Sequence, residues 1–175
     1  MTYEIRDATR DDAHAVAQVW VDSWRAAYGD LLTSEQIESR TVELREGHWA
    51  SEFNHPTSLR SVRLIAEDDD GAAGFVTSGP SQDDGASESD AEVRAIYLAE
   101  RAWGKGLGAE LLQGAVDGLR GKGFASAALW VLEGNSRARR FYEREGWTLD
   151  GGHKDCFGGV DAPAVRYRRS LEQPK

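Results

Sequence analysis

The sequence is poor in residues that crosslink a chain or carry it into a membrane. Its 175 residues include a single cysteine, Cys156, which excludes an internal disulfide and suits a reducing compartment. No apolar run approaches the roughly 20 residues of a membrane-spanning helix. The segment Met1–Arg6 lacks the features of a signal peptide and has the pattern of a strand. We therefore expect a cytoplasmic protein with no membrane partner.

Positive charge is also scarce. The chain has 21 Lys and Arg against 30 Asp and Glu, which gives a formal net charge of -9 at pH 7. Nucleic-acid-binding domains are normally basic, so we expect no nucleic-acid partner. The acidic run Asp68–Asp70 is most simply a solvated turn, because a metal site would need more oxygen ligands than this run offers by itself. We predict no metal site.

Hydrophobic periodicity predicts a mixed α/β chain that forms a single domain over residues 1–175. In the second predicted helix we expect Leu44 and Trp49 to face inward and Gly47 to interrupt the helix. Residues 79–90 are expected to form a polar loop without a chemical role. Strands are expected over residues 2–7, 61–67, 72–78, 92–98, 125–132, 147–154 and 161–170, and helices over residues 9–28, 34–53, 107–121 and 136–145.

The stretch 91–109 combines a strand, a glycine-rich turn and the start of a helix. Val93, Ala95 and Tyr97 alternate with their neighbours, which predicts a strand with these three side chains on one face. Glycines then stand at alternate positions from Gly104 to Gly108, so a ligand can approach the main chain closely. The free N–H groups and positive dipole of the following helix N-terminus would favour a phosphate there.

The turn differs from the two commonest phosphate-binding fingerprints. A P-loop needs two glycines four residues apart followed by Lys and Ser or Thr, and no such run is present. The dinucleotide fingerprint Gly-x-Gly-x-x-Gly is also absent, since the glycines here are evenly spaced. Taken alone, the order Arg101-x-x-Gly104-x-Gly106 therefore fits either a phosphate loop or a tight turn without a ligand.

A second motif follows. After the strand predicted over 125–132, the chain reads Asn-x-x-Ala-x-x-Phe-Tyr-x-x-x-Gly-Trp from Asn135 to Trp147. Together and in this order, the two motifs resemble those of the GNAT family of N-acetyltransferases. The resemblance implies the GNAT acyl-CoA N-acyltransferase fold, which is a mixed seven-stranded sheet with four helices. Its central strands four and five are parallel, and the strands before them are antiparallel.

The resemblance also implies a binding site for acetyl-CoA. Main-chain N–H groups from Gly104 to Gly108 would hold the pyrophosphate, with charge added by Arg101. The backbone around Ile96 and Leu98 would bind the pantetheine as an added strand does. The full set implied by the resemblance is Ile96, Tyr97, Leu98, Arg101, Trp103, Gly104, Lys105, Gly106, Leu107, Gly108, Asn135, Arg137 and Tyr142. Simpler roles stay open, namely solvated charge for Arg101 and Lys105 and a helix N-cap for Asn135.

For catalysis, Tyr142 matches the tyrosine that the family uses to protonate the leaving thiolate. A phenol has a pKa of about 10 and an alkyl thiol one of about 8.5, so this transfer costs little. Tyr142 could instead be a core side chain, but the adjacent Phe141 already fills the apolar position, which favours the catalytic role. Glu92 matches a glutamate that could take the proton of the amine, or it could be a solvated carboxylate at a strand end. Trp24 and Tyr28, one helical turn apart, are weak candidates for the acceptor pocket.

These residues predict an enzyme that moves the acetyl group of acetyl-CoA directly to a primary amine, with coenzyme A as the product. A small-molecule acceptor is favoured over a protein. The alternative is a non-catalytic acyl-CoA-binding regulatory module, which would have no need of a proton donor at Tyr142. A homodimer is compatible with the tryptophan content if those side chains are exposed.

Overall fold

The computed structural model describes residues 2–172, apart from the side chain of Thr57. Within this range the strands form one seven-stranded sheet in the order β1-β2-β3-β4-β5-β7-β6. The β4–β5 pair is parallel and the other neighbouring pairs are antiparallel, as the resemblance implies. The strands are β1 (Glu4–Asp7), β2 (Val62–Asp68), β3 (Gly71–Pro80), β4 (Asp90–Leu98), β5 (Ser126–Leu132), β6 (Thr148–Lys154) and β7 (Ala164–Ser170).

The described residues form five α-helices, one more than the sequence predicts. They are α1 (Ala13–Tyr28), α2 (Ser34–Glu38), α3 (Val42–Asn54), α4 (Leu107–Gly121) and α5 (Ser136–Arg144). The predicted helix over 34–53 is two helices, because the Thr41 side chain accepts the N–H of Leu44 and caps a new helix. Gly47 lies inside α3 and does not interrupt it. Trp49 is fully buried as predicted, whereas Leu44 is 43% exposed and that prediction was wrong.

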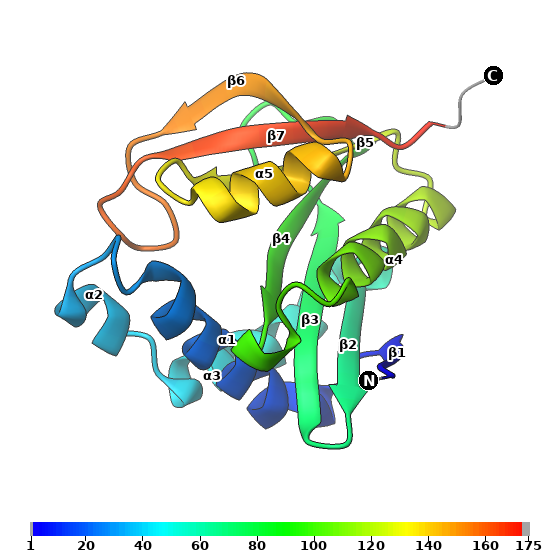
Figure 1. Cartoon of the computed structure of the whole chain (residues 1–175). Helices are drawn as coiled ribbons and strands as arrows, with labels where there is room; N and C mark the ends of the chain where they lie inside the picture. The colour runs from blue at the N-terminus through cyan, green and yellow to red at the C-terminus, as the bar shows by residue number, and fades with distance from the viewer. Residues whose placement is uncertain (1, 173–175) are drawn as a thin grey trace.

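Helices cover both faces of the sheet (Figure 1). Leu107, Leu111 and Leu119 of α4 pack with Val93 of β4 in a core that also takes in Phe141 of α5. On the opposite face, α1 and α3 pack around Trp49 and Phe75 in a second core. All six tryptophans are buried or half-buried within the described residues, so they give no support to a homodimer. The two layers leave the central strands β4 and β5 between them.

A β-bulge at Arg94 changes which side chains of β4 share a face. Thr77 of β3 lies opposite Ala95 and the next residue, Ser78, lies opposite Val93, so Arg94 is the extra residue. Val93 therefore packs against α4, whereas Ala95 and Tyr97 pack on the α1–α3 side. The single face predicted for Val93, Ala95 and Tyr97 was wrong, because a bulge leaves no mark in hydrophobic alternation.

The parallel strands β4 and β5 are paired over only part of their length. Their register runs from Asp90 opposite Ser126 to Val93 opposite Leu129. Beyond that point β4 continues with β3 to Leu98 and β5 continues with β7, and Figure 1 shows the two strands moving apart. Main-chain groups of the outer half of β4 are thereby left without a strand on that side, which opens the centre of the sheet.

Candidate active site

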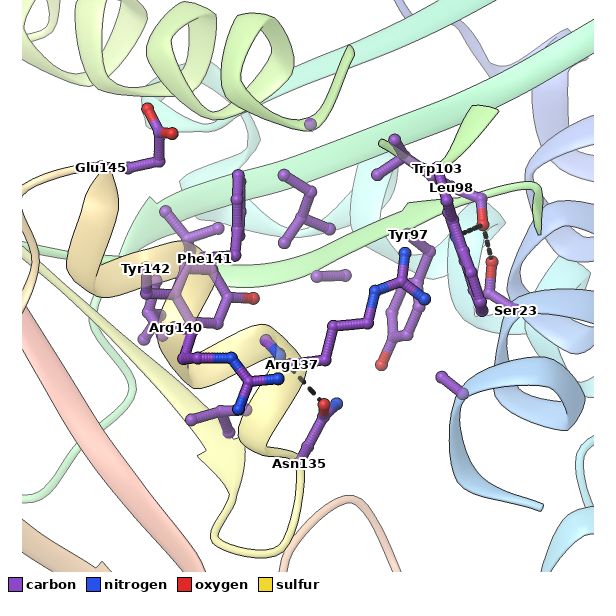
Figure 2. Close-up of a pocket in the computed structure, with 18 of the residues that line it drawn as sticks. Ser23, Tyr97, Leu98, Trp103, Asn135, Arg137, Arg140, Phe141, Tyr142 and Glu145 are labelled. Atoms are coloured by element: carbon purple, nitrogen blue, oxygen red, sulfur yellow. Dashed lines mark hydrogen bonds between the residues drawn. The ribbon is translucent and has the colours of Figure 1, made fainter. Parts of the chain in front are cut away.

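A cavity of about 610 Å³ lies where β4 and β5 separate. One side is formed by the outer half of β4 and the glycine turn, and the other by the first turns of α5 (Figure 2). Ala27 and Tyr28 of α1 and Phe157 of the β6–β7 loop also line it. The cavity therefore reaches from the α4–α5 side of the sheet to the α1 side, through the opening between the two strands.

Main-chain atoms of the glycine turn line one side of this cavity. Gly104 and Gly106 have φ values of 73° and 89°, a left-handed conformation that L side chains rarely adopt. A Cβ atom at either glycine would meet no atom within 4 Å, so backbone conformation and not crowding requires glycine here. Gly106 is the N-cap of α4 and provides no capping side chain. The first N–H groups of α4 next to the cavity are suited to a diphosphate.

The outer half of β4 presents its main chain toward the cavity. The N–H of Ala99 donates to the carbonyl of Ala73 at 2.9 Å, and antiparallel ladders alternate in direction. Ile96 and Leu98 therefore direct their main-chain groups away from β3. The carbonyl of Leu98 agrees with this, because it accepts hydrogen bonds from Trp103 Nε1 at 3.0 Å and Ser23 Oγ at 2.5 Å (Figure 2).

Two arginines of α5 add positive charge to the cavity. Arg137 and Arg140 both line it, and the Arg137 guanidinium carbon lies 3.6 Å from the centre of the Trp103 ring (Figure 2). Partial burial lowers the pKa of Arg137. Arg101 does not lie where the first motif predicted it, beside the pyrophosphate site. It does not line the cavity, and it donates to Asp68 Oδ1 and to the carbonyls of Gly71 and Ala72 in the β2–β3 turn.

Three tyrosine hydroxyls from three elements converge on the cavity. Tyr28 of α1, Tyr97 of β4 and Tyr142 of α5 all line it, and Tyr142 is only 8% exposed. Figure 2 shows the Tyr142 hydroxyl directed into the cavity from α5. Burial is the main cause that raises the pKa of each of the three phenols, and the Tyr97 hydroxyl raises the pKa of Tyr28 and Tyr142 further. All three phenols are therefore protonated at neutral pH, and the raised pKa of Tyr142 makes proton transfer to a thiolate more costly than the ordinary pKa values indicate.

Asn135 has the helix-capping role that the sequence left open. Its side chain caps α5 by accepting the N–H of Ala138 at 3.0 Å (Figure 2). It also lines the cavity, near Tyr28 of α1. Its contact with pantetheine stays a prediction.

Glu92 lies beside the cavity near the paired end of β4. It is not among the described residues that line the cavity, although its neighbours Val93 and Arg94 are. Its Oε2 accepts the main-chain N–H of Gln82 at 3.1 Å. Burial raises the pKa of Glu92, and the nearby Asp83 raises it further. A buried carboxylate with a raised pKa is suited to accepting a proton.

The two candidates for the acceptor pocket lie in different positions. Tyr28 lines the cavity, whereas Trp24 is not part of the lining and is 3% exposed. The two rings are 4.5 Å apart, and the Arg40 guanidinium lies 4.6 Å from the centre of the Trp24 ring. Trp24 is therefore a supporting layer behind Tyr28.

A polar cluster around Trp130 was not predicted from the sequence. Trp130 lines the cavity, and its Nε1 donates to the carboxylate of Asp83 at 3.0 Å. The same carboxylate forms ion pairs of 3.0 Å with Lys154 and Arg166. Asp83 belongs to the loop to which no chemistry was assigned. Its partners are 47 to 83 residues away in the sequence, so no local pattern could indicate the contact.

The geometry agrees with comparisons to known proteins. The sequence model of the acetyltransferase (GNAT) family matches residues 13–147. The chain is 34% identical over 134 residues to YuaI of Bacillus subtilis, named an uncharacterized N-acetyltransferase, covering 75% of this chain and 72% of that protein. It is 30% identical over 165 residues to the probable N-acetyltransferase Rv2775 of Mycobacterium tuberculosis, covering 89% and 84% of the two chains.

A solved structure shares the fold over the whole chain. YncA of Salmonella typhimurium, solved with its cofactor acetyl-CoA, superposes with a TM-score of 0.74 at 18% sequence identity, covering 100% of this chain and 97% of that one. The protein described here belongs to the GNAT family. It is an acetyl-CoA-dependent N-acetyltransferase. Among residues 2–172, no helix is both long and apolar enough to cross a membrane.

Proposed function

We propose that this chain transfers the acetyl group of acetyl-CoA directly to the primary amine of a small molecule. The observation that carries the proposal is the shared cavity. It joins a diphosphate-binding helix N-terminus, free main-chain groups of β4 and the buried hydroxyl of Tyr142. Acetyl-CoA supplies an activated thioester, and the amine acceptor supplies the nucleophile.

The residues present fit the long, phosphate-rich shape of the cosubstrate. The first N–H groups of α4, including those of Leu107 and Gly108, would hold the diphosphate, and Arg137 would contribute charge from the opposite wall. The free main-chain groups of Ile96 and the N–H of Leu98 would pair with the pantetheine amides, whereas the carbonyl of Leu98 already accepts two hydrogen bonds. Lys105 and Tyr97 remain proposed members of the set, whereas the contacts of Arg101 favour a role in holding the β2–β3 turn.

Each proton in the transfer has a proposed place to go. Glu92, directly or through water, takes a proton from the ammonium so that the amine can attack the thioester carbonyl. As the new carbon–nitrogen bond forms and the carbon–sulfur bond breaks, Tyr142 gives its proton to the departing sulfur, and the amine's second proton is released to solvent. The products are the acetylated amine and coenzyme A.

Residues on the α1 side of the cavity support a small acceptor over a protein. Phe157 and Tyr28 line the cavity there. The Arg40 guanidinium donates to the carbonyl of Gly158 and joins the α2–α3 connection to the β6–β7 loop that contains Phe157. A concave pocket accepts a small amine more readily than a lysine on a folded protein surface.

Thermal melting with acetyl-CoA, ATP and NAD, each tested separately at equal concentration, tests the cosubstrate. A ligand at 100 times its dissociation constant adds about 2.7 kcal/mol of stability. We expect a shift with acetyl-CoA alone. Thiol release across a panel of amines then separates the enzyme from the regulatory module. Acetyl-CoA binding without turnover of any amine, in both wild type and Tyr142→Phe, would favour the module.

A further inference from the structure

A second cavity, of about 410 Å³, lies on the α3 side of the sheet. Its lining is dominated by the arginines Arg45 of α3, Arg63 of β2 and Arg94 of β4, with Glu52 and Gln82 beside them. It contains no element of either sequence motif. Apart from Arg94, its residues line no part of the first cavity and take no part in the proton transfers described above.

Two of the three arginines of this cavity are buried, and Arg94 is half-buried. Arg45 is 7% exposed and Arg63 is 8% exposed. Glu52 bridges them, with its Oε1 2.9 Å from Arg45 Nη1 and its main-chain carbonyl 2.7 Å from Arg63 Nη2. The Nε atoms of Arg45, Arg63 and Arg94 and the Oε2 atom of Glu52 are nevertheless buried without a hydrogen-bond partner among the described residues. Arg63 Nε and Glu52 Oε2 lie 3.7 Å apart, which leaves the Nε donors of Arg45 and Arg94 without an acceptor nearby. Buried donors without acceptors are costly, and a bound anion would satisfy them.

The charge of the cavity matches a single negative group. Three arginines face two carboxylates, those of Glu52 and the adjacent Glu92, which leaves a formal excess of one positive charge. Guanidinium groups bind carboxylates through two parallel hydrogen bonds, and such pairs are strongest where water is excluded. Desolvation lowers the pKa of Arg63 and Arg94, which shows that both cations lack full solvation.

Arg94 joins the second cavity to the first. It lines both, and it is the bulged residue that turns β4 toward α3. Its Nη2 donates to the carbonyl of Pro80 at 2.7 Å, which fixes the guanidinium over the end of β3. Gln82 lines the second cavity and donates its main-chain N–H to Glu92, the proposed base. A molecule with its anion beside Arg94 would thus place its other end toward Glu92 and the opening between β4 and β5.

We propose that the acceptor is an amino acid or an amino-acid-like molecule whose carboxylate is bound by Arg45 and Arg94 while its amine faces the β4–β5 opening. This inference rests on the proposed function, since it names the substrate class of that same site. The unpaired guanidinium donors, the excess positive charge and the position of Arg94 between the cavities support it together. Acceptors without a carboxylate would leave those donors unsatisfied and bind poorly.

The test uses matched pairs of acceptors. Thiol release from acetyl-CoA is measured with each of the common L-amino acids and with the primary amide of each, which keeps the amine and removes the negative charge. We expect at least one acid to be turned over with a kcat/KM about 100-fold above that of its amide, in line with a site that discriminates by buried polar groups.

Arg94→Met sharpens the test, with Arg94→Lys as the conservative variant and Arg25→Met as the control. Arg25 lies on the exposed surface of α1, and its side chain is 59% exposed. Arg94→Met should raise KM for the acid by a much larger factor than KM for the amide, and Arg94→Lys should recover part of the loss. Arg25→Met should match wild type. Melting temperatures identify any variant that fails to fold, and Arg45→Met then provides the second variant.

Three outcomes would overturn the inference. The first is equal turnover of acids and amides by wild type, and the second is an equal loss for both in Arg94→Met. The third is the acetylation of other amines with no amino acid accepted. Calorimetry with acetyl-CoA alone separates these outcomes from failure of the proposed function. An absent acetyl-CoA signal defeats both proposals, whereas normal binding with any of the three outcomes defeats only this one.

Discussion

The two cavities of this protein are built in different ways. The first is walled by the glycine turn and the start of α5, each of which is a short continuous segment with a recognisable spacing. The second brings together side chains from α3, β2, β4 and the loop before β4, and those residues share no motif. Binding of a constant cosubstrate can be encoded by main chain and glycines. Selection of a particular acceptor depends on side chains that the fold assembles from distant positions.

The largest expected effect lies in the first cavity. Tyr142→Phe should lower kcat about 10²–10⁴-fold and leave the dissociation constant of acetyl-CoA near its wild-type value, because only the proton donor is lost. Tyr167→Phe is the matched control, since Tyr167 is a buried tyrosine whose ring lies 6.1 Å from that of Tyr142 and whose hydroxyl bonds to Glu143 instead of lining the cavity. Equal losses in both variants would mean that Tyr142 acts only through packing.

A smaller effect should appear at Glu92, between the two cavities. Because burial raises its pKa above the ordinary 4.5, the acidic limb of the kcat/KM profile should lie at higher pH than a solvated glutamate would give. The base is active only when ionised, so the rate should rise with pH through this pKa. Glu92→Gln should lower kcat/KM about 10–100-fold and remove the limb. An unchanged profile in the variant would assign the base to another group.

The glycine turn tests whether the first cavity depends on main-chain conformation. Gly106→Ala must hold an alanine at a φ of 89°, which costs about 1–2 kcal/mol. We expect acetyl-CoA affinity to fall about tenfold by calorimetry as the turn relaxes. Gly121→Ala, at the end of the same helix with open space around it and no left-handed backbone, is the control. Comparable losses in the two variants would contradict a specific role for the turn.

The smallest effect is expected at Asp90, which lies below both cavities where β4 and β5 pair. Its carboxylate accepts hydrogen bonds from Ser126 Oγ at 2.6 Å and from the N–H of Ser87 at 2.9 Å, and these bonds lower its pKa to about 2. A depressed pKa adds stability above the unfolded value of 3.8, and this stability is lost as the pH falls toward 2. Allowing for solvent screening, Asp90→Asn should cost about 1 kcal/mol at neutral pH.

Denaturant unfolding of both forms at pH 7 and pH 3 checks this expectation for Asp90. The difference in unfolding free energy should shrink at the lower pH, and acetyl-CoA affinity should not change. A loss of affinity without a loss of stability would show that the paired end of the two strands also shapes the first cavity.

Much of the fold could be predicted because its elements have strong local signals. The period of α4, the cap at Asn135 and the stop after Asn54 all lie in short stretches of sequence. The bulge at Arg94 could not be predicted, since an extra residue in one strand is defined only by its partner strand. Arg101 was predicted to bind phosphate from its place in a motif, but its partner Asp68 is 33 residues away and became visible only in the fold.

The residues of the candidate site also differ in whether the sequence could predict them. Positions such as Gly106, Asn135 and Tyr142 could be named because the motif fixes their spacing, and each lines the first cavity. Asp83 and the buried arginines could not, because charged side chains in a sequence are far more often solvated than buried. Their significance comes from burial and from unsatisfied hydrogen bonds, which are properties of the tertiary structure.

The stacking of Arg137 on Trp103 has an optical consequence. The indole lies under a cation and donates its N–H to the carbonyl of Leu98, so its emission depends on both contacts. A diphosphate that attracts the guanidinium away from the ring would change the fluorescence of Trp103, while the fully buried Trp49 and Trp147 would give a constant background. Trp130 also lines the cavity, so comparing wild type with Trp103→Phe would give the part of the signal that comes from Trp103.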